Sequence, residues 1–428
     1  MALPKIKFAG GGERFQYLTH KGNDTTIRFL LRYPALLDAD ILCAVLGRMV
    51  ESVDILHSTF FTDPTNAYWK VNEDVAQHHY FRHIQTSGDP MIVAKSLSVY
   101  PVDHQGKAQL RCELVHNDHE SVIVLAISHL CVDGGDGKYL LNKLVEGYNL
   151  LSSGKSLEDL TIKNGNRAPE QVYENFSLKD MKGMLKMPIS SSVTSAYPFP
   201  TEASGSRRVT TAAIPASVMD AARKKAKTVG ASANDLLLAA AYQVYAAFPH
   251  VEPGTPVSIS SMMDLRRHCK NGESDGLCNM SGAMPTAMPD GVCADFADTL
   301  IRIARQTAAA KSDPLAGMGG MPLLHGATRT VPMGLLLMAS NKLYGAMPVG
   351  LTNLGNLRAA DLALDGVAPM ETIFGGPLKM KNGFQISIIS LDGACTLACY
   401  GSYTAEDQAH IQRTLHAIVD TIEHYAAE

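Results

Sequence analysis

The sequence has few charged residues, and this shortage limits the kinds of protein that it can encode. Asp, Glu, Lys and Arg make up 19% of the 428 residues, whereas about 25% is usual for soluble domains. Apolar residues make up 46%, which excludes a largely disordered chain and indicates extensive buried or ligand-facing apolar surface. The formal net charge is −4, with Lys and Arg scattered along the chain, so nucleic acid is a poor candidate partner.

Long hydrophobic runs and paired cysteines are absent as well. The longest apolar stretches, around 236–242 and 333–339, fall short of the roughly 20 residues that a membrane span needs. No apolar segment follows residues 1–7, so the sequence predicts no signal peptide. The eight cysteines form no CxxC pair. We interpret them as reduced thiols of a cytoplasmic protein, with neither a metal site nor a disulfide framework.

The length of the chain predicts two lobes, because 428 residues exceed what one ordinary hydrophobic core supports. Helix and strand signals alternate in both halves, which indicates an α/β protein. The best linker candidate is the polar segment 196–208, which contains Pro, Gly and Ser. We therefore expect an N-terminal lobe over 1–195 and a C-terminal lobe over 209–428.

The most informative segment follows an apolar run, 122–127, that is typical of a strand buried on both faces. His129 stands where the chain leaves this strand, Asp133 follows four residues later, and Gly134 and Gly135 then lead into a helix. Strand ends in α/β proteins hold side chains at clefts. The HxxxD spacing alone is weak, however, because it recurs by accident elsewhere in the chain.

The segment from His129 to Gly134 resembles the HxxxDG signature of the chloramphenicol acetyltransferase-like superfamily. This group includes peptide-synthetase condensation domains, plant BAHD acyltransferases, polyketide-associated acyltransferases and alcohol acetyltransferases. Further segments agree with the family in order and spacing: Glu13-Arg14-Phe15 with its opening strand, 54–60 with the segment after its first helix, 230–237 with the helix that opens its second lobe, Asp264-Leu265-Arg266 with a DLR motif, Cys278-Asn279-Met280 with a G-N segment, and Thr352-Asn353-Leu354-Gly355 with an S/T-N-x-G segment.

The chain also departs from the family in informative places. Ser128 stands where many condensation domains have a second histidine, and the usual arginine is missing from segment 54–60. The DFGWG motif of the plant group is absent, and Trp69 is the only tryptophan. These departures favour a stand-alone enzyme of the alcohol acetyltransferase or polyketide-associated kind.

The resemblance implies a fold and an activity. The fold would be two similar-sized α/β lobes, each a mixed β-sheet flanked by helices, with an active-site tunnel between them. The activity would be acyl transfer from a thioester to a small alcohol or amine. The enzyme is expected to be a monomer that binds no cofactor and uses acyl-CoA or an acyl or peptidyl carrier protein as donor. Two alternatives stay open, namely amide formation on carrier-bound substrates and a non-catalytic module that docks a carrier protein.

Residue roles carry over from the same resemblance. His129 would be the general base, and Asp133 would either orient it, as in a hydrolase triad, or pair with Arg266; we favour the ion pair, because a buried carboxylate without a partner is costly. The backbone of Gly134 would approach the substrate and help to bind an oxyanion. The remaining expected site residues are tunnel groups: Ser128, Asn279, Thr352 and Asn353.

Two further features have a functional and a structural interpretation. Cys131 lies two residues from His129 and invites a Cys–His mechanism, but we favour packing. Ten of the nineteen methionines fall between 262 and 347. They predict either core filling or a deformable apolar tunnel. The one GxSxG match, at residues 272–276, follows polar residues instead of an apolar strand and therefore forms no nucleophile elbow, so we expect no acyl-enzyme.

Overall fold

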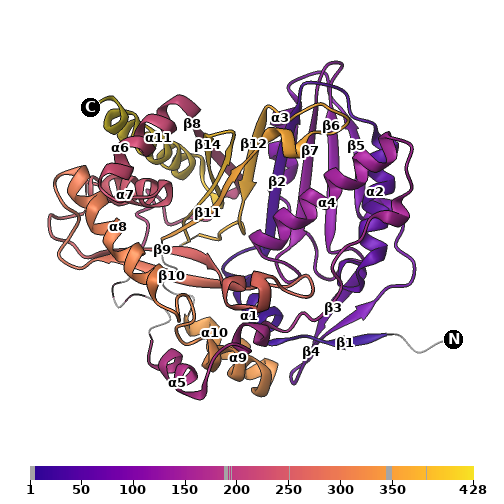
Figure 1. The fold of residues 1–428 in the computed structure, drawn as a ribbon, viewed down its shortest axis with the longest axis horizontal. Coiled ribbons are helices and arrows are strands. Elements are labelled where there is room, and N and C mark those ends of the chain that lie inside the picture. The colour runs from indigo at the N-terminus through magenta and orange to yellow at the C-terminus, as the bar shows by residue number, and fades with distance from the viewer. Residues whose placement is uncertain are drawn as a thin grey trace.

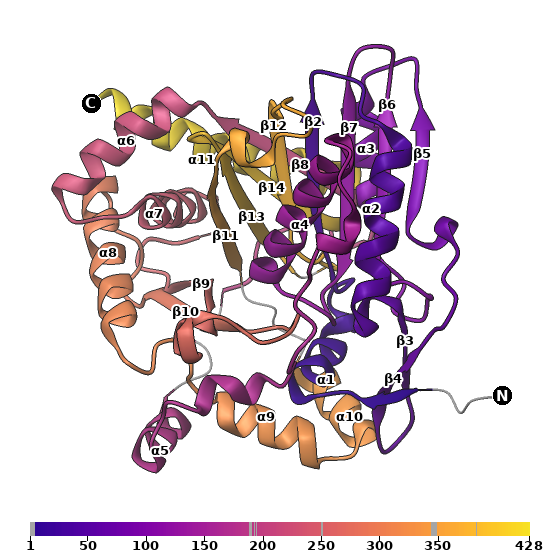
Figure 2. The same ribbon diagram turned by 45° about the vertical axis from the view of Figure 1, so that its right-hand side comes forward.

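The computed structural model describes residues 5–187, 191, 193, 195–249, 251–343, 349–381 and 383–428. Two large β-sheets stand side by side in this part of the chain, and helices cover each of them (Figures 1 and 2). This arrangement confirms the expected α/β architecture with mixed sheets. No helix among the described residues is long and apolar enough to cross a membrane.

The first large sheet has five strands and carries the HxxxDG segment. Their spatial order is β12 (Glu371–Gly375), β2 (Thr26–Tyr33), β7 (Ser121–Ser128), β6 (Leu110–His116) and β5 (Phe81–Gln85). All pairs are antiparallel except β5 with β6. Helices α2 (Ala39–Ser52) and α4 (Gly134–Ser152) pack on one face, and α3 (Pro90–Ser98) packs on the other. Every residue of β7 is buried, which explains why its sequence is apolar at successive positions.

The second large sheet has six strands. Their order is β10 (Ser281–Met288), β9 (Val257–Asp264), β11 (Gly350–Leu357), β13 (Gln385–Leu391), β14 (Ala394–Tyr403) and β8 (Ser206–Ile214). β11 is parallel to both of its neighbours, and the other pairs are antiparallel. Four helices belong to this lobe: α6 (Ala216–Thr228), α7 (Ala233–Ala246), α8 (Phe296–Ser312) and α11 (Ala405–Ala427). Both α7 and α11 begin with a capping box, at Ser232 and Thr404.

A third, smaller layer lies beneath the two sheets in Figures 1 and 2. It contains the sheet β1 (Ile6–Phe8), β4 (Ala67–Val71) and β3 (Ser58–Thr62), in that order, and the helices α1 (Gly11–Leu18), α5 (Leu178–Lys186), α9 (Met321–Thr330) and α10 (Met333–Leu343). The segment Glu13-Arg14-Phe15 therefore lies in a helix, where the family resemblance predicted a strand. Glu13 accepts a hydrogen bond from the Gly10 backbone N–H at 2.6 Å and stabilises this helix at its first turn.

The halves of the chain exchange elements. Strand β12 comes from the C-terminal half but pairs with β2, with Glu371 opposite Arg32, and it also contacts β13 and β14. Helices α9 and α10, from the same half, pack on α1. In addition, β8 begins at Ser206, inside the expected linker. The spatial lobes therefore do not coincide with the two halves of the sequence. The linker at 196–208 stays a prediction.

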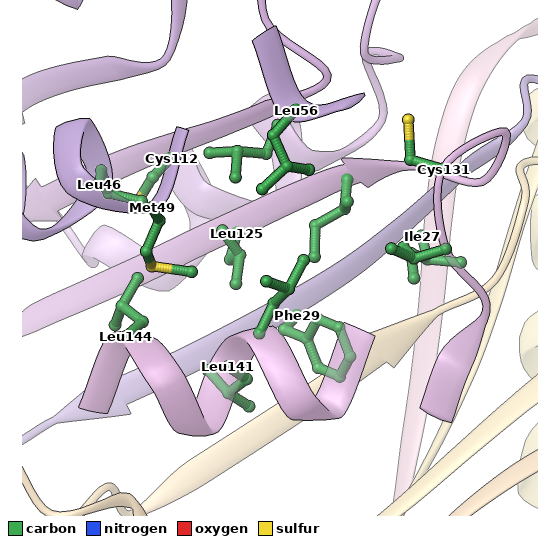
Figure 3. Packing of buried hydrophobic residues seen from close by; sticks show 14 of the residues in the cluster. Ile27, Phe29, Leu46, Met49, Leu56, Cys112, Leu125, Cys131, Leu141 and Leu144 are labelled. Carbon is green, nitrogen blue, oxygen red and sulfur yellow. The ribbon is translucent and has the colours of Figure 1, made fainter. Parts of the chain in front are cut away.

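The apolar residues form closed clusters within and between the lobes. Figure 3 shows part of the cluster under α2 and α4, where Phe29, Leu125 and Leu141 meet, and Cys131 lies at its edge. A separate buried cluster joins the lobes through Leu30 and Val124 of the first sheet and Tyr400 of the second. The apolar surplus in the composition is therefore used mainly in the two large core clusters, and a smaller part packs the junction.

Candidate active site

His129 lies just beyond the end of β7, between the two lobes. Its backbone N–H donates to the Thr25 carbonyl at 2.7 Å, which continues the pairing of β7 with β2 by one residue. Its side chain is partly exposed, although the strand before it is fully buried. The sequence predicted that His129 follows the end of this strand, because the apolar run 122–127 ends just before it.

Asn279 contacts the imidazole of His129 from the segment before β10. Its Nδ2 lies 2.8 Å from His129 Nδ1 and 3.3 Å from the His129 carbonyl oxygen. The backbone N–H of Ser281 donates to Asn279 Oδ1 at 3.2 Å, so the amide is held at both ends. Asn279, expected only as a tunnel residue, occupies the Nδ1 edge of the ring and leaves Nε2 as the nitrogen that can face a substrate.

The environment of His129 favours its neutral form. Burial lowers the pKa of His129 below its ordinary value of 6.5, and the positive charge of Lys379 lowers it further. The Asp133 charge and the backbone carbonyls of His129 and Val132 oppose this shift. A neutral imidazole can accept a proton. The surroundings thus favour a neutral His129 ring at neutral pH.

Asp133 points toward Arg266 and caps α4. Its Oδ2 accepts hydrogen bonds from Arg266 Nη1 at 2.8 Å and from the Met280 backbone N–H at 2.7 Å. Its Oδ1 accepts from the backbone N–H of Asp136 at 3.0 Å. Burial would raise the pKa of Asp133, but the Arg266 guanidinium holds it below its ordinary value of 3.8. Between the two expected roles, the contacts match the ion pair.

Arg266 joins several acidic groups at this point, and two of its neighbours were not found from the sequence. Its Nη2 lies 3.0 Å from Asp136 Oδ2, and Lys163 Nζ lies 2.5 Å from Asp136 Oδ1. Asp136 also accepts a hydrogen bond from the Cys278 backbone N–H at 2.7 Å. The four charged side chains therefore connect the start of α4 with the DLR segment and with the chain on either side of Asn279. Asp136 lies three residues after Asp133, a spacing that could have indicated a second buried acid.

Position 135 requires glycine, because the ion pair leaves little room for a side chain there. A Cβ atom at position 135 would lie 3.0 Å from Arg266 Nη1 and 3.1 Å from Asp264 Oδ2. Neither Gly134 nor Gly135 has a positive φ angle, so their role is not a left-handed turn. The absence of a side chain at 135 lets the guanidinium approach the first turn of α4.

A pocket of about 150 Å³ opens beside this turn and is lined by four of the eight expected site residues, Asp133, Gly134, Thr352 and Asn353. His129, Ser128, Asn279 and Arg266 do not line it. Its walls include Gly134 from the first lobe and Ser281, Thr352 and Asn353 from the second. Asn353, in β11, is held by the residues that follow it, because its Oδ1 accepts from the Gly355 N–H at 2.9 Å. Met262 and Met263 also line the pocket, while Met280, Met284, Met288, Met318 and Met333 are buried in the protein interior. Most described methionines of this region thus fill cores.

Two residues near His129 do not reach an open space. Ser128, expected in the tunnel wall, is only 1% exposed, because it lies inside β7. Cys131 is fully buried in the cluster of Figure 3, and burial raises the pKa of its thiol to about 12. A thiol in that state is a poor nucleophile at neutral pH, which agrees with the packing role. Among the described residues, no group of three or more His, Cys, Asp and Glu is placed to hold a metal ion.

We expect Asn279 to position His129, and substitution tests this. Asn279→Ala removes the contact with Nδ1 and should lower kcat on the order of 10²-fold through misplacement of the ring. Asn279→Asp retains a group at Nδ1 but adds a negative charge, so it should raise the pKa of His129 and move the acidic limb of the pH profile upward. Steady-state kinetics across pH 5–9 would show both effects. Equal profiles for the two variants would contradict a positioning role.

Comparison with known proteins places this geometry in a known fold. No protein-family model matches the sequence, and no curated protein matches it. Several solved structures do match. Polyketide synthase associated protein 5 from Mycobacterium tuberculosis has a TM-score of 0.70 at 15% identity over 97% of this chain and 96% of its own. The first condensation domain of the CDA synthetase has a TM-score of 0.70 at 15% identity, with 99% and 97% of the two chains covered.

An acetyltransferase shares the same architecture. TRI3 trichothecene 15-O-acetyltransferase from Fusarium sporotrichioides superposes with a TM-score of 0.68 at 14% identity, over 98% of this chain and 95% of that one. This chain has the condensation-domain, chloramphenicol acetyltransferase-like fold. Identities this low establish the fold alone. Within the fold, the connection between His129, Asn279, Asp133 and Arg266 comes from this chain's own contacts.

Proposed function

We propose that the protein is an acyltransferase, which moves an acyl group from a CoA or carrier-protein thioester to the hydroxyl or amine of a small acceptor. The observation that carries this proposal is the partly exposed His129 at the lobe junction, held at Nδ1 by Asn279. The likeness to an acetyltransferase and to a condensation domain supports the same class of reaction. The DLR and HxxxDG segments lie in contact through Arg266 and Asp133, which supports it further.

The proposed reaction proceeds in one ternary complex. The acceptor oxygen or nitrogen attacks the thioester carbonyl carbon while His129 takes its proton at Nε2. For this, neutral His129 must carry its own proton on Nδ1, for which the carbonyls of His129 and Val132 are acceptors. The Asn279 amide must then present its oxygen to Nδ1, because the amide nitrogen that lies there in the structure can only donate and would leave the ring proton on Nε2. The tetrahedral intermediate then breaks its C–S bond, and the leaving thiolate takes the proton from His129. The products are an ester or amide and a free thiol, and the enzyme returns to its initial state.

The start of α4 supports a site for the developing oxyanion. Gly134 lines the pocket as the first residue of this 19-residue helix, and no described residue accepts a hydrogen bond from its N–H group. Free N–H groups at a helix start, together with the helix dipole, stabilise negative charge. The Asp133–Arg266 pair fixes where this turn lies. We therefore assign the oxyanion site to the first turn of α4.

The proposal is tested by thiol release. Purified protein is mixed with a panel of acyl-CoAs and with alcohol or amine acceptors, and free thiol is measured with a chromogenic disulfide reagent while the acylated product is identified by mass spectrometry. Acceptor-dependent thiol release with the acylated acceptor as product supports the proposal, and amide products alone would indicate the condensation-type alternative. Carrier-bound thioesters form a parallel arm. Absence of acceptor-dependent release in both arms would contradict the proposed function.

The pH dependence should follow His129. Because burial lowers the pKa of His129, kcat/KM should decline only below pH 6.5, its ordinary value, as the ring gains a proton. The charge of Lys379 contributes to this lowered pKa, so Lys379→Met should move the acidic limb to higher pH. Initial rates in buffers of constant ionic strength would measure both midpoints. A wild-type midpoint above 6.5 would conflict with the environment described.

A further inference from the structure

Lys379 lies at the junction of the two lobes, where the segment 23–25 separates it from His129: Lys379 pairs with Asn23, and the Thr25 carbonyl accepts the His129 backbone N–H. The backbone N–H of Lys379 donates to the Tyr400 carbonyl at 3.0 Å, and its carbonyl accepts from the Ser402 N–H at 2.9 Å. On the other side it pairs with Asn23 as an isolated bridge, just before β2. The preceding residue, Leu378, points into the cluster that joins the lobes. Since side chains alternate along extended chain, Lys379 points to the opposite side of this segment.

The ammonium group of Lys379 has no counter-ion of its own in the described part of the chain. No described acceptor lies within hydrogen-bond or ion-pair distance of Nζ, and the residue is partly exposed despite its deep position. Its stem runs beside Gly383, where a Cβ atom would lie 3.1 Å from Lys379 Cβ. Burial lowers the pKa of Lys379 to about 8. A charged amine held in this way is unfavourable unless an anion accompanies it.

Asp24, the carboxylate whose charge acts on Lys379, is already occupied. Its Oδ2 pairs with Arg28 Nη2 and with Arg207 Nη1, the latter at 3.3 Å. Its Oδ1 accepts the backbone N–H groups of Leu378 at 2.9 Å and of Thr26 at 3.3 Å. Two arginines thus pair with a single carboxylate. Lys379 adds a third positive charge without pairing with it, so the junction keeps an excess of positive charge. This excess acts on His129, whose pKa the Lys379 charge lowers.

We propose that Lys379 forms a subsite for a carboxylate group of the substrate, beside the reacting atoms at His129. The inference rests on the proposed acyl transfer, and it names the substrate class for that site. The carboxylate belongs either to the acceptor, as in a hydroxy acid, or to the far end of the acyl group, as in a dicarboxylic thioester. A neutral substrate would leave the ammonium without a counter-ion, so the site discriminates in favour of the acid.

Two pairs of probes separate the two sources. Succinyl-CoA and butyryl-CoA differ by a carboxylate in place of a methyl group at the end of the acyl chain. 3-Hydroxyoctanoate and 3-hydroxyoctanamide differ by the charge of the acceptor. Binding of each is measured by calorimetry in the His129→Ala background, so that affinity is measured without turnover, and kcat/KM is measured for each in the enzyme with His129 intact.

The expected result is a preference for one acid over its neutral partner that depends on Lys379. Lys379→Met should reduce this preference by about 10-fold to 100-fold, as expected for a lost hydrogen bond to a charged group, and Lys379→Arg should retain part of it. The exposed Lys155 provides the control, since Lys155→Met should leave the preference unchanged. Thermal unfolding of each variant shows that the comparison is made between folded proteins.

The outcomes distinguish the two proposals. A preference in the succinyl pair assigns the carboxylate to the donor, and a preference in the hydroxy acid pair assigns it to the acceptor. A Lys379-dependent preference in binding without any thioester turnover would support the subsite and contradict the proposed function. Equal affinity of the parent protein for both members of each pair, or a preference that survives Lys379→Met, overturns the subsite.

Discussion

Replacement of His129 by Ala should reduce kcat by about 10²-fold to 10⁴-fold, the usual contribution of a positioned general base. Because the imidazole is partly exposed and its partner Asn279 has other contacts, we expect the variant to fold and to unfold at nearly the same temperature. Thiol release with saturating donor and acceptor measures the loss, and calorimetry measures the unfolding. Binding of the acyl-CoA should change little, since the proposed role concerns proton transfer.

The exposed residue His119 provides a matched control. His119→Ala removes the same side chain from the turn between β6 and β7, away from the pocket, and should retain full activity. Activity of His129→Ala equal to that of His119→Ala would exclude the mechanism proposed above. Restoration of part of the activity by added imidazole would strengthen it.

Replacement of Asp133 by Asn should mainly destabilise the fold. The amide would place a donor among groups that all donate to Asp133, namely Arg266 Nη1 and the backbone N–H groups of Met280 and Asp136. Loss of one member of a buried ion pair costs about 3–5 kcal/mol, which urea unfolding would measure. Because the pKa of Asp133 is held below 3.8, its contribution to stability is complete above that pH and is lost as the pH falls through the lower, folded-state value.

Asp264 provides a matched control for Asp133, because it contacts the same arginine, Arg266. It also contacts Arg266 Nη1, at 3.1 Å, but its side chain is 54% exposed. Asp264→Asn should therefore cost no more than about 1 kcal/mol. If Asp133→Asn were as stable as Asp264→Asn but lost activity as fully as His129→Ala, the triad role would replace the ion pair. A stable protein with normal activity would exclude both roles.

The parts of the fold that the sequence predicted correctly are those with local signals. The apolar run of 122–127 indicated a strand buried on both faces, and β7 is buried at every residue. In contrast, the pairing of β12 with β2 depends on residues far apart in the chain. No local pattern distinguishes a strand that stays in its own lobe from one that joins the other.

The candidate site also contains some contacts that the sequence predicted and others that it did not. The HxxxDG and DLR segments were sufficient to predict the contact between Asp133 and Arg266, because the family resemblance implies this long-range pair. The resemblance did not indicate that Asn279 would contact Nδ1 of His129 rather than a substrate. Lys379 carries no motif at all, and only the folded arrangement shows that Asp24 is already occupied by two arginines.

The crossing of β12 into the first sheet has a consequence for how the chain is made. During synthesis, β2 remains an open sheet edge until residues 371–375 have been translated, and open edges invite pairing with other chains. The pairing also closes a very long loop, which is slow to form. The first lobe produced alone should therefore aggregate or require a chaperone, and the two lobes mature together only when the chain is nearly complete.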